Sequence, residues 1–121
     1  MKKIIPLNDL INLYKKGFFP MSKSRYSDDV SFFKPKFRFI IPINNFHVPK
    51  KLFRLFKKTK FNFKINFDFE EVISNCQQNA RKDNDSWIND KILNTYLELY
   101  KINKCHSVEC YEDSKIIGGL Y

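Results

Sequence analysis

Apolar and polar residues alternate regularly between residues 61 and 67, which read FNFKINF. Successive side chains of a strand point to opposite faces, so this alternation predicts a half-buried β-strand. A second alternating stretch runs over residues 37–43, where Pro42 favours a strand end or an edge strand. Near the end of the chain, residues 107–111 and 115–121 predict the two strands of a hairpin, with Asp113 and Ser114 in its turn.

Helical spacing is clearest after Asp68. Apolar or small side chains follow at offsets 0, 3, 4, 7 and 11 from Phe69, the last of them Ala80, and Asp68 and Glu71 have the D-x-x-E spacing of a capping box. These residues therefore predict a helix that begins at residue 69. A polar loop is expected after it, around residues 83–85.

Three further helices are indicated by residues that suit helix ends. Asn89 suits the N-cap of a helix over the residues that follow it, and Pro49 suits the first turn of a helix that extends to about Thr59. A short helix is predicted between Asn8, as its cap, and Gly17, which suits the left-handed residue after a helix. Residues 22–30 read as a polar loop.

The predicted order of elements is helix, strand, helix, strand, helix, helix, strand, strand. This order favours the α+β class, with about four helices and a small mixed or antiparallel sheet. The 121 residues suit one modest hydrophobic core, and 43% hydrophobic residues with 13 Phe predict a folded chain.

The excess of positive charge lies entirely in the first half of the chain. Residues 1–60 hold 15 Lys or Arg and 3 Asp or Glu, whereas residues 61–121 hold 7 and 10. This asymmetry is typical of a protein that binds a polyanion such as a nucleic acid. A lysine-rich surface in an AT-biased proteome explains the charge equally well, so charge alone leaves both interpretations open.

The three cysteines have no CxxC spacing, and with His106 they form only a weak zinc pattern. We expect free, mostly buried thiols and no metal. No apolar run has the roughly 20 residues needed to cross a bilayer, and charged residues follow the basic start at once, so no signal peptide is expected. These features predict a cytoplasmic protein without a membrane partner.

Few residues combine into a recognisable catalytic motif. His106 and Ser107 are neighbours on a predicted strand and point to opposite faces, which argues against a nucleophile–base dyad. Gly118 and Gly119 lack the flanking residues of a phosphate-binding loop. Trp87, the only tryptophan, either packs against the helix that it precedes or offers a plane on which a base stacks.

Seven short motifs, taken together in this order, resemble the leucyl/phenylalanyl-tRNA–protein transferase family. They are YKKGFFP (14–20), FHVP (46–49), FDFEEVI (67–73), SWI (86–88), YLEL (96–99), HSVE (106–109) and GGLY (118–121). The resemblance implies an aminoacyltransferase that moves Leu or Phe from its tRNA onto the N-terminal Arg or Lys of an acceptor protein. This reaction marks the acceptor for degradation by the bacterial N-degron pathway.

The resemblance also implies which residues meet the donor. Trp87 and Tyr96 match family residues at the terminal adenosine, and Tyr14 matches the Tyr that precedes a G-x-F-P corner. Met21 stands where many members have a Trp, so that contact loses its aromatic plane. The ester is already activated, so neither metal nor ATP is implied. The tRNA acceptor stem is the expected partner of a basic helical face formed by Lys50, Lys51, Arg54, Lys57 and Lys58.

In the family, the GGLY motif precedes a further stretch of similar length that holds the catalytic centre. By this resemblance, residues 1–60 form a basic N-terminal α+β subdomain, and residues 61–121 begin an acetyltransferase-like (GNAT-like) domain that is cut off at a strand. The chain is therefore expected to be a truncated transferase that is inactive alone. A fragment that only binds the tRNA acceptor end, or an interaction half that needs a second polypeptide, are the alternatives.

Overall fold

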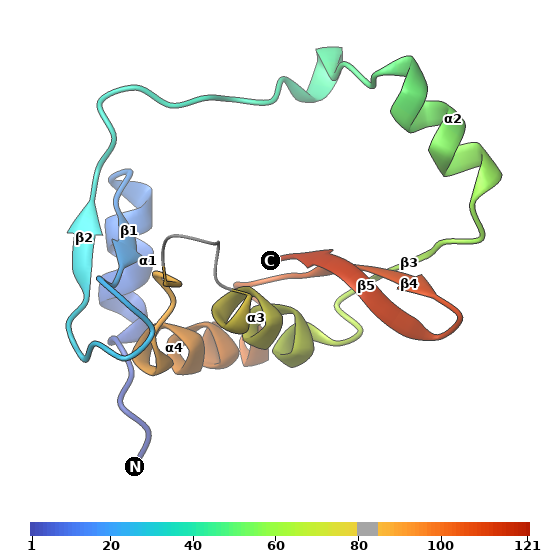
Figure 1. Ribbon diagram of the computed structural model, residues 1–121. Helices are drawn as coiled ribbons and strands as arrows, with labels where there is room; N and C mark the ends of the chain where they lie inside the picture. Colours follow the sequence, from blue (N-terminus) through green and yellow to red (C-terminus); the bar gives the residue numbers. More distant parts are fainter. Residues whose placement is uncertain (80–84) are drawn as a thin grey trace.

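The computed structural model describes residues 1–79 and 85–121, which form an α+β fold with four α-helices and two small antiparallel sheets (Figure 1). The fold class expected from the sequence is thus confirmed. Ala80 and the loop expected around residues 83 and 84 lie outside the described residues. In chain order the elements are α1 (Leu7–Lys15), β1 (Phe19–Met21), β2 (Ser31–Phe33), the 3-10 helix η1 (Ile43–Asn45), α2 (Lys50–Lys58), β3 (Asn62–Ile65), α3 (Phe69–Gln78), α4 (Asp90–Lys101), β4 (Val108–Glu112) and β5 (Lys115–Leu120).

Local side-chain chemistry sets several helix ends. The Asp68 carboxylate accepts a hydrogen bond from the Glu71 N–H at the start of α3, and the Asn89 side chain accepts one from the Ile92 N–H at the start of α4. Gly17 follows α1 with φ of +87°, which a residue with a Cβ rarely adopts. All three were predicted. The cap assigned to Asn8 is wrong, because α1 begins at Leu7, directly after Pro6, and Asn8 is its second residue.

The larger sheet has the order β3-β4-β5, and both of its pairs are antiparallel. Asp113 and Ser114 both have positive φ in the turn between β4 and β5, the backbone of a tight two-residue hairpin turn. The strand predicted within residues 61–67 and the terminal hairpin are therefore confirmed. The smaller sheet pairs β1 with β2, a pair that the sequence pattern does not predict, and the polar loop predicted over residues 22–30 connects these two strands.

The strand predicted over residues 37–43 is wrong. This stretch is irregular and ends in the 3-10 helix η1, and its alternating apolar residues are exposed on both sides, with Phe39 fully open to solvent. An alternating pattern forms a strand only when the backbone pairs and one face is covered. Within the described residues neither condition holds here.

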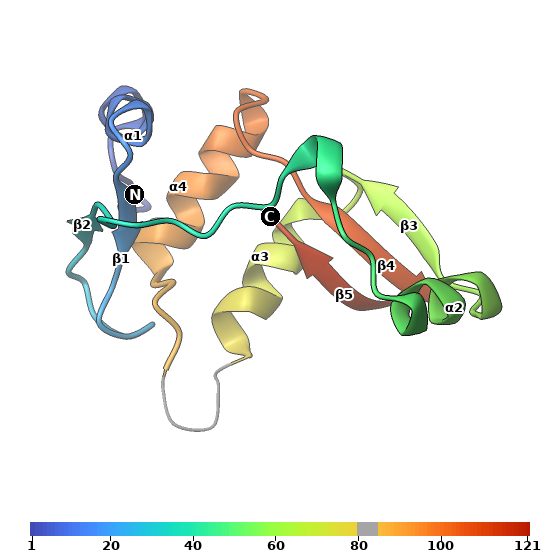
Figure 2. The ribbon, with the colours of Figure 1, turned by 90° about the horizontal axis from the view of Figure 1, so that it is seen from above.

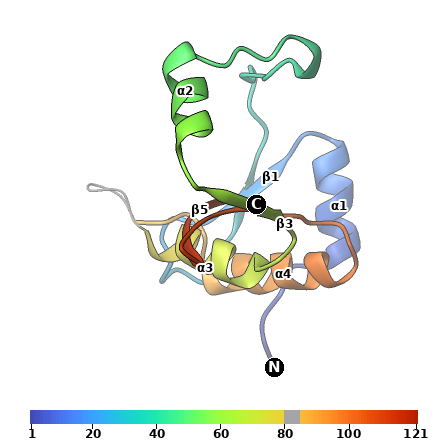
Figure 3. The ribbon, with the colours of Figure 1, turned by 90° about the vertical axis from the view of Figure 1, so that its right-hand side faces the viewer.

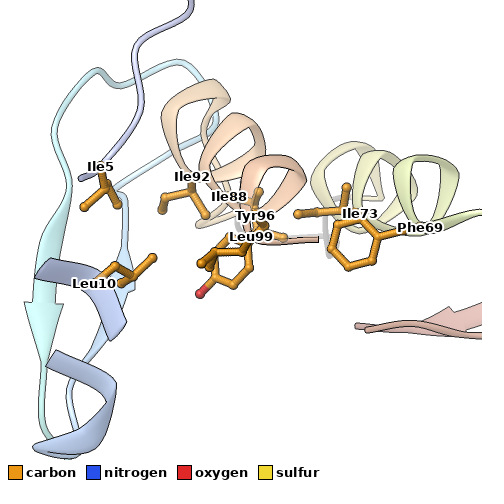
Figure 4. Close-up of a cluster of buried hydrophobic side chains, with 8 residues drawn as sticks. All are labelled: Ile5, Leu10, Phe69, Ile73, Ile88, Ile92, Tyr96 and Leu99. Atoms are coloured by element: carbon orange, nitrogen blue, oxygen red, sulfur yellow. The ribbon is translucent and has the colours of Figure 1, made fainter. Parts of the chain in front are cut away.

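The hydrophobic core lies where α1, α3 and α4 meet. Thr95 on α4 accepts a hydrogen bond from the Ile5 N–H at 2.9 Å, which holds the N-terminal segment against this helix. Phe69 stacks on Tyr100 with ring centroids 4.5 Å apart. Each fully buried side chain of this kind stabilises the fold by about 1.5–3 kcal/mol. Figure 4 shows the cluster, which consists of Ile5, Leu10, Phe69, Ile73, Ile88, Ile92, Tyr96 and Leu99.

Residues 34–60, which we call the arch, leave the body of the molecule after β2 and return at β3 (Figure 1). Seen from above, α3 and α4 lie between the β1–β2 pair and the larger sheet (Figure 2), and from the side α2 stands clear of both helices (Figure 3). No residue of α2 is buried, although Phe56 contacts Phe63 with centroids 5.6 Å apart. A division of the chain at residue 60 stays a prediction.

Candidate functional site

A cavity of about 720 Å³ lies beside α1 and α4 and is rich in aromatic side chains. Three of the residues predicted at the donor adenosine line it together: Tyr14 from α1, Trp87 from the segment before α4, and Tyr96 from α4. Tyr121 completes the aromatic lining, and Lys15 and Lys104 contribute positive charge. The cavity therefore offers flat apolar faces beside cationic groups, which suits a nucleotide.

The hydroxyl groups of Tyr14 and Tyr96 are joined by a hydrogen bond. Burial raises the pKa of both side chains, and for Tyr96 the hydrogen bond to Tyr14 raises the pKa further. Both phenols are therefore neutral at physiological pH. Tyr96 is buried whereas Tyr14 is 43% exposed, so Tyr96 fixes the position of a ring that faces the cavity.

Tyr121 is a lining residue that the sequence analysis did not assign to the site. Its ring meets Tyr96 edge to face, with centroids 5.4 Å apart. Its hydroxyl group is buried without a hydrogen-bond partner among the described residues, and burial raises its pKa. A buried hydroxyl group without a partner is costly.

Trp87 projects outward from a buried segment. Its neighbours Ser86, Ile88 and Asn89 are buried, whereas Trp87 itself is 39% exposed. Trp87 also lines a second cavity of about 1070 Å³, together with Met21 and Tyr121. Met21 is thus brought to Trp87 but not to the cavity that holds Tyr14 and Tyr96.

His106 also lines the first cavity, and Asn66 fixes its ring. The Asn66 Oδ1 atom accepts a hydrogen bond from the Ser107 N–H at 2.9 Å, so its Nδ2 atom donates to His106 Nδ1 at 3.0 Å. An amide NH₂ can only donate, so the hydrogen of a neutral His106 ring resides on Nε2. His106 is therefore arranged as a donor and not as the base of Ser107.

Ser107 instead donates its hydroxyl hydrogen to the buried Glu109 carboxylate at 2.5 Å. The backbone N–H groups of Phe67 and Asp68 also donate to this carboxylate, at 3.4 Å and 3.3 Å. Glu109 thus joins β4 to the start of α3. The HSVE motif is explained by this structural network.

The basic helix α2 is not part of either cavity. All of its predicted tRNA-contacting residues are exposed, and Lys57 lies over the Phe53 ring, 4.5 Å from its centroid. The cations that line the first cavity are Lys15 and Lys104, which the sequence analysis did not single out. The exposed cations on α2 are Lys50, Lys51, Arg54, Lys57 and Lys58.

Over residues 1–79 and 85–121, no three His, Cys, Asp or Glu side chains are grouped so that they could hold a metal ion. No helix in the described part of the chain has the length and apolar character to span a membrane. The thiols of Cys76, Cys105 and Cys110 are free and partly buried.

The sequence matches known proteins along its length. Residues 40–121 match the model of the family described as leucyl/phenylalanyl-tRNA protein transferase. A protein of that name from Zymomonas mobilis is 37% identical over all 121 residues, which make up 45% of its length. One from Chlorobaculum tepidum is 36% identical over 98% of the chain and 60% of its own length, and one from Maricaulis maris is 35% identical over 93% and 52%. The chain spans about half the length of these relatives.

Proposed function

The chain belongs to the leucyl/phenylalanyl-tRNA–protein transferase family, and we propose that it binds the aminoacylated end of Leu-tRNA or Phe-tRNA. The observation that carries this proposal is the gathering of Tyr14, Trp87 and Tyr96 around one cavity, although Tyr14 and Tyr96 are 82 residues apart. We assign this cavity to the terminal adenosine of the donor. An aromatic side chain contributes roughly 1–3 kcal/mol by stacking on a base.

In the proposed reaction, the donor is an ester between the amino acid and a ribose hydroxyl group of this adenosine. The α-amine of the acceptor attacks the ester carbonyl as the free base, a peptide bond forms, and the bond to the ribose oxygen breaks. The attacking amine loses a proton and the departing ribose oxygen gains one. The acceptors are proteins with N-terminal Arg or Lys, and the product enters the N-degron pathway in the cytoplasm. Neither metal nor ATP is required, because the ester is already activated.

The described residues supply donor binding and not proton transfer. Glu109 is engaged by Ser107 and two backbone N–H groups, and His106 accepts from Asn66 at Nδ1. Neither residue is free to act as a base. We propose that the 121-residue chain alone transfers amino acids poorly or not at all.

Met21 reduces the affinity for the donor. It lies beside Trp87 in the second cavity and has no aromatic plane. Met21→Trp is expected to tighten donor binding about tenfold, which is the lower part of the stacking range.

The exposed cations of α2 are proposed to contact the phosphate backbone of the acceptor stem. Such contacts depend on salt and hardly on sequence, because counterions are released when phosphates are neutralised. Lys15 and Lys104 supply positive charge nearer the adenosine.

A second candidate function is an interaction half that binds another polypeptide. The many exposed apolar side chains of the arch favour it, because exposed apolar surface is what an interaction site buries. Phe39, Ile40 and Ile43 are among the most exposed of these side chains. If the chain is monomeric in solution and binds Phe-tRNA as tightly as a full-length member of the family, this candidate function is wrong.

The affinity of the chain for Phe-tRNA tests the proposed function. Trp87→Ala should weaken binding by roughly tenfold to a hundredfold, whereas Lys101→Gln, which removes a cation from an exposed ion pair on α4, should not change it. Incubation with Phe-tRNA and an Arg-N-terminal peptide measures transfer. Efficient transfer would show that the chain holds the proton-transfer groups. If Trp87→Ala bound Phe-tRNA as tightly as the unchanged protein, the cavity would not be the binding site of the adenosine.

A further inference from the structure

Two segments, residues 22–29 and 85–89, are joined by several hydrogen bonds. We call these two segments the clasp. The Ser22 N–H donates to the Trp87 carbonyl oxygen at 2.9 Å. The Asn89 side-chain amide donates to the carbonyl oxygens of Ser27, at 2.7 Å, and Asp29, at 3.4 Å. The clasp thus ties the loop between β1 and β2 to the segment that carries Trp87.

An ion pair between Arg25 and Asp85 lies at the centre of the clasp. The Arg25 Nε atom donates to Asp85 Oδ1 at 2.6 Å, and the Arg25 backbone N–H donates to Oδ2 at 3.1 Å. A further guanidinium N–H donates to the carbonyl oxygen of Gln78, the last residue of α3, at 3.3 Å. Only about a quarter of each charged side chain is exposed, so solvent screens this pair less than the other two ion pairs of the described chain.

Hydrogen bonds to Asp85 and Ser86 also hold the backbone on both sides of Trp87. The Asp85 Oδ1 atom also accepts from the Ser86 N–H at 2.8 Å, and Ser86 Oγ accepts from the Ile88 N–H at 3.1 Å. Partial burial raises the pKa of Asp85, but hydrogen bonds from Arg25 and from the Ser86 N–H lower it overall. The carboxylate therefore remains charged at neutral pH.

We propose that Arg25 and Asp85 are positioning residues that fix the Trp87 ring at the cavity before the donor arrives. This inference rests on the proposed function, because it assigns the ring to the donor. A ring that is already in place loses less conformational entropy on binding, which raises affinity without any new contact. Arg25 acts through Asp85 and the backbone of Trp87, and it donates from Nε to Asp85 and from Nη1 to Gln78 within the protein.

If Arg25 instead contacted a phosphate group of the donor, replacing Asp85 would have the opposite effect on donor affinity. If Arg25 held the donor by charge, removal of Asp85 would free a cation and tighten binding of Phe-tRNA. If the pair positions Trp87, Arg25→Ala and Asp85→Ala both weaken binding although they change the net charge in opposite directions. Lys101→Gln is the matched control, because it also breaks an ion pair but on the exposed face of α4.

The test combines two measurements on the 121-residue chain. Trp87 is the only tryptophan, so its fluorescence anisotropy and its quenching by acrylamide report the mobility and exposure of this ring alone. Circular dichroism shows that each variant has folded, and Arg25→Lys, which keeps the charge but only one donor nitrogen, supplies a milder change if Arg25→Ala fails to fold. The affinity for Phe-tRNA is measured on the same samples.

We expect Arg25→Ala and Asp85→Ala to lower the anisotropy of Trp87, to increase its quenching, and to weaken Phe-tRNA binding about threefold to tenfold. Arg25→Lys should lie between these variants and the unchanged protein, and Lys101→Gln should match the unchanged protein. Unchanged anisotropy in folded Asp85→Ala, or tighter Phe-tRNA binding by it, would overturn the positioning role. A different result is possible, in which Arg25→Ala and Asp85→Ala lower the anisotropy of Trp87 but Trp87→Ala binds Phe-tRNA normally. The positioning of Trp87 by the clasp would then be supported, and the proposed function would be wrong.

Discussion

Asn66 holds the imidazole ring of His106 in one tautomer. The Asn66 side chain accepts from the Ser107 N–H at Oδ1 and donates to His106 Nδ1 at 3.0 Å. Asn66 has φ of +55°, in the left-handed region that Asn tolerates better than most residues. This conformation presents a side chain that must donate to the ring, and it places the ring hydrogen on the nitrogen that remains.

Replacing Asn66 with Asp should reverse this tautomer. A carboxylate can only accept, so His106 Nδ1 must carry the hydrogen, while the Ser107 N–H keeps its acceptor. The ¹⁵N chemical shifts of the neutral ring report which nitrogen carries the hydrogen. His47, the only other histidine, is the internal control and should not change. An Nδ1–H tautomer in the unchanged protein would contradict the arrangement.

Gly119→Ala should destabilise the fold, and Gly118→Ala should not. A Cβ at position 119 would lie 2.9 Å from Val72 Cγ2 and 3.1 Å from Cγ1, whereas one at position 118 meets nothing within 4 Å. We expect Gly119→Ala to lower the free energy of unfolding in urea by about 1–3 kcal/mol, because β5 must move away from α3. Equal stability of the two variants would show that β5 is not packed tightly against this helix.

Alkaline pH should reveal the buried tyrosines. Burial raises the folded-state pKa of Tyr96 and Tyr121 above the unfolded value of about 10. Their contribution to stability is therefore complete below pH 10 and is lost as the pH rises through the folded pKa. Absorbance at about 295 nm should show fewer ionised tyrosines at pH 10–11 in the folded chain than in urea. Tyr96→Phe should reduce this difference, and superimposed titration curves would contradict it.

The exposed apolar residues of the arch should make the isolated chain bind hydrophobic dyes and self-associate. Ile40 and Ile43 are 79% and 93% exposed. Replacing both with Asn should reduce dye binding and association measured by light scattering, and it should change the free energy of unfolding by about 0.5 kcal/mol or less. Leu10→Ala, in the core, should cost about 2–5 kcal/mol. A large loss of stability in the Ile40/Ile43 variant would mean that the arch is covered.

The elements that could be predicted from the sequence are those whose causes lie close together in the chain. Asp68 and Asn89 accept from N–H groups three residues away, and Asp113 and Ser114 form a turn between adjacent strands. The strand predicted over residues 37–43 was wrong because an alternating pattern shows which face could be buried but not whether another element covers it. The β1–β2 pair has only three residues in each strand, too few for a visible pattern.

In the candidate site, too, residues in recognisable local motifs could be predicted, and residues that depend on distant contacts could not. The motif resemblance identified Tyr14, Trp87 and Tyr96, and the structure brings them to one cavity. Tyr121 was missed as a site residue because its role depends on contacts with Tyr96 and Phe69, which no local pattern encodes. The link between Arg25 and Asp85 spans 60 residues of sequence and was equally invisible.

The most direct test of the central claim compares two forms of one tRNA. We propose that the cavity lined by Tyr14, Trp87 and Tyr96 binds the terminal adenosine of the donor. Phe-tRNA should therefore quench the fluorescence of Trp87, and the same tRNA without its terminal adenosine should bind through its backbone with little quenching. Equal quenching by both forms, or none by Phe-tRNA at saturation, would contradict the account.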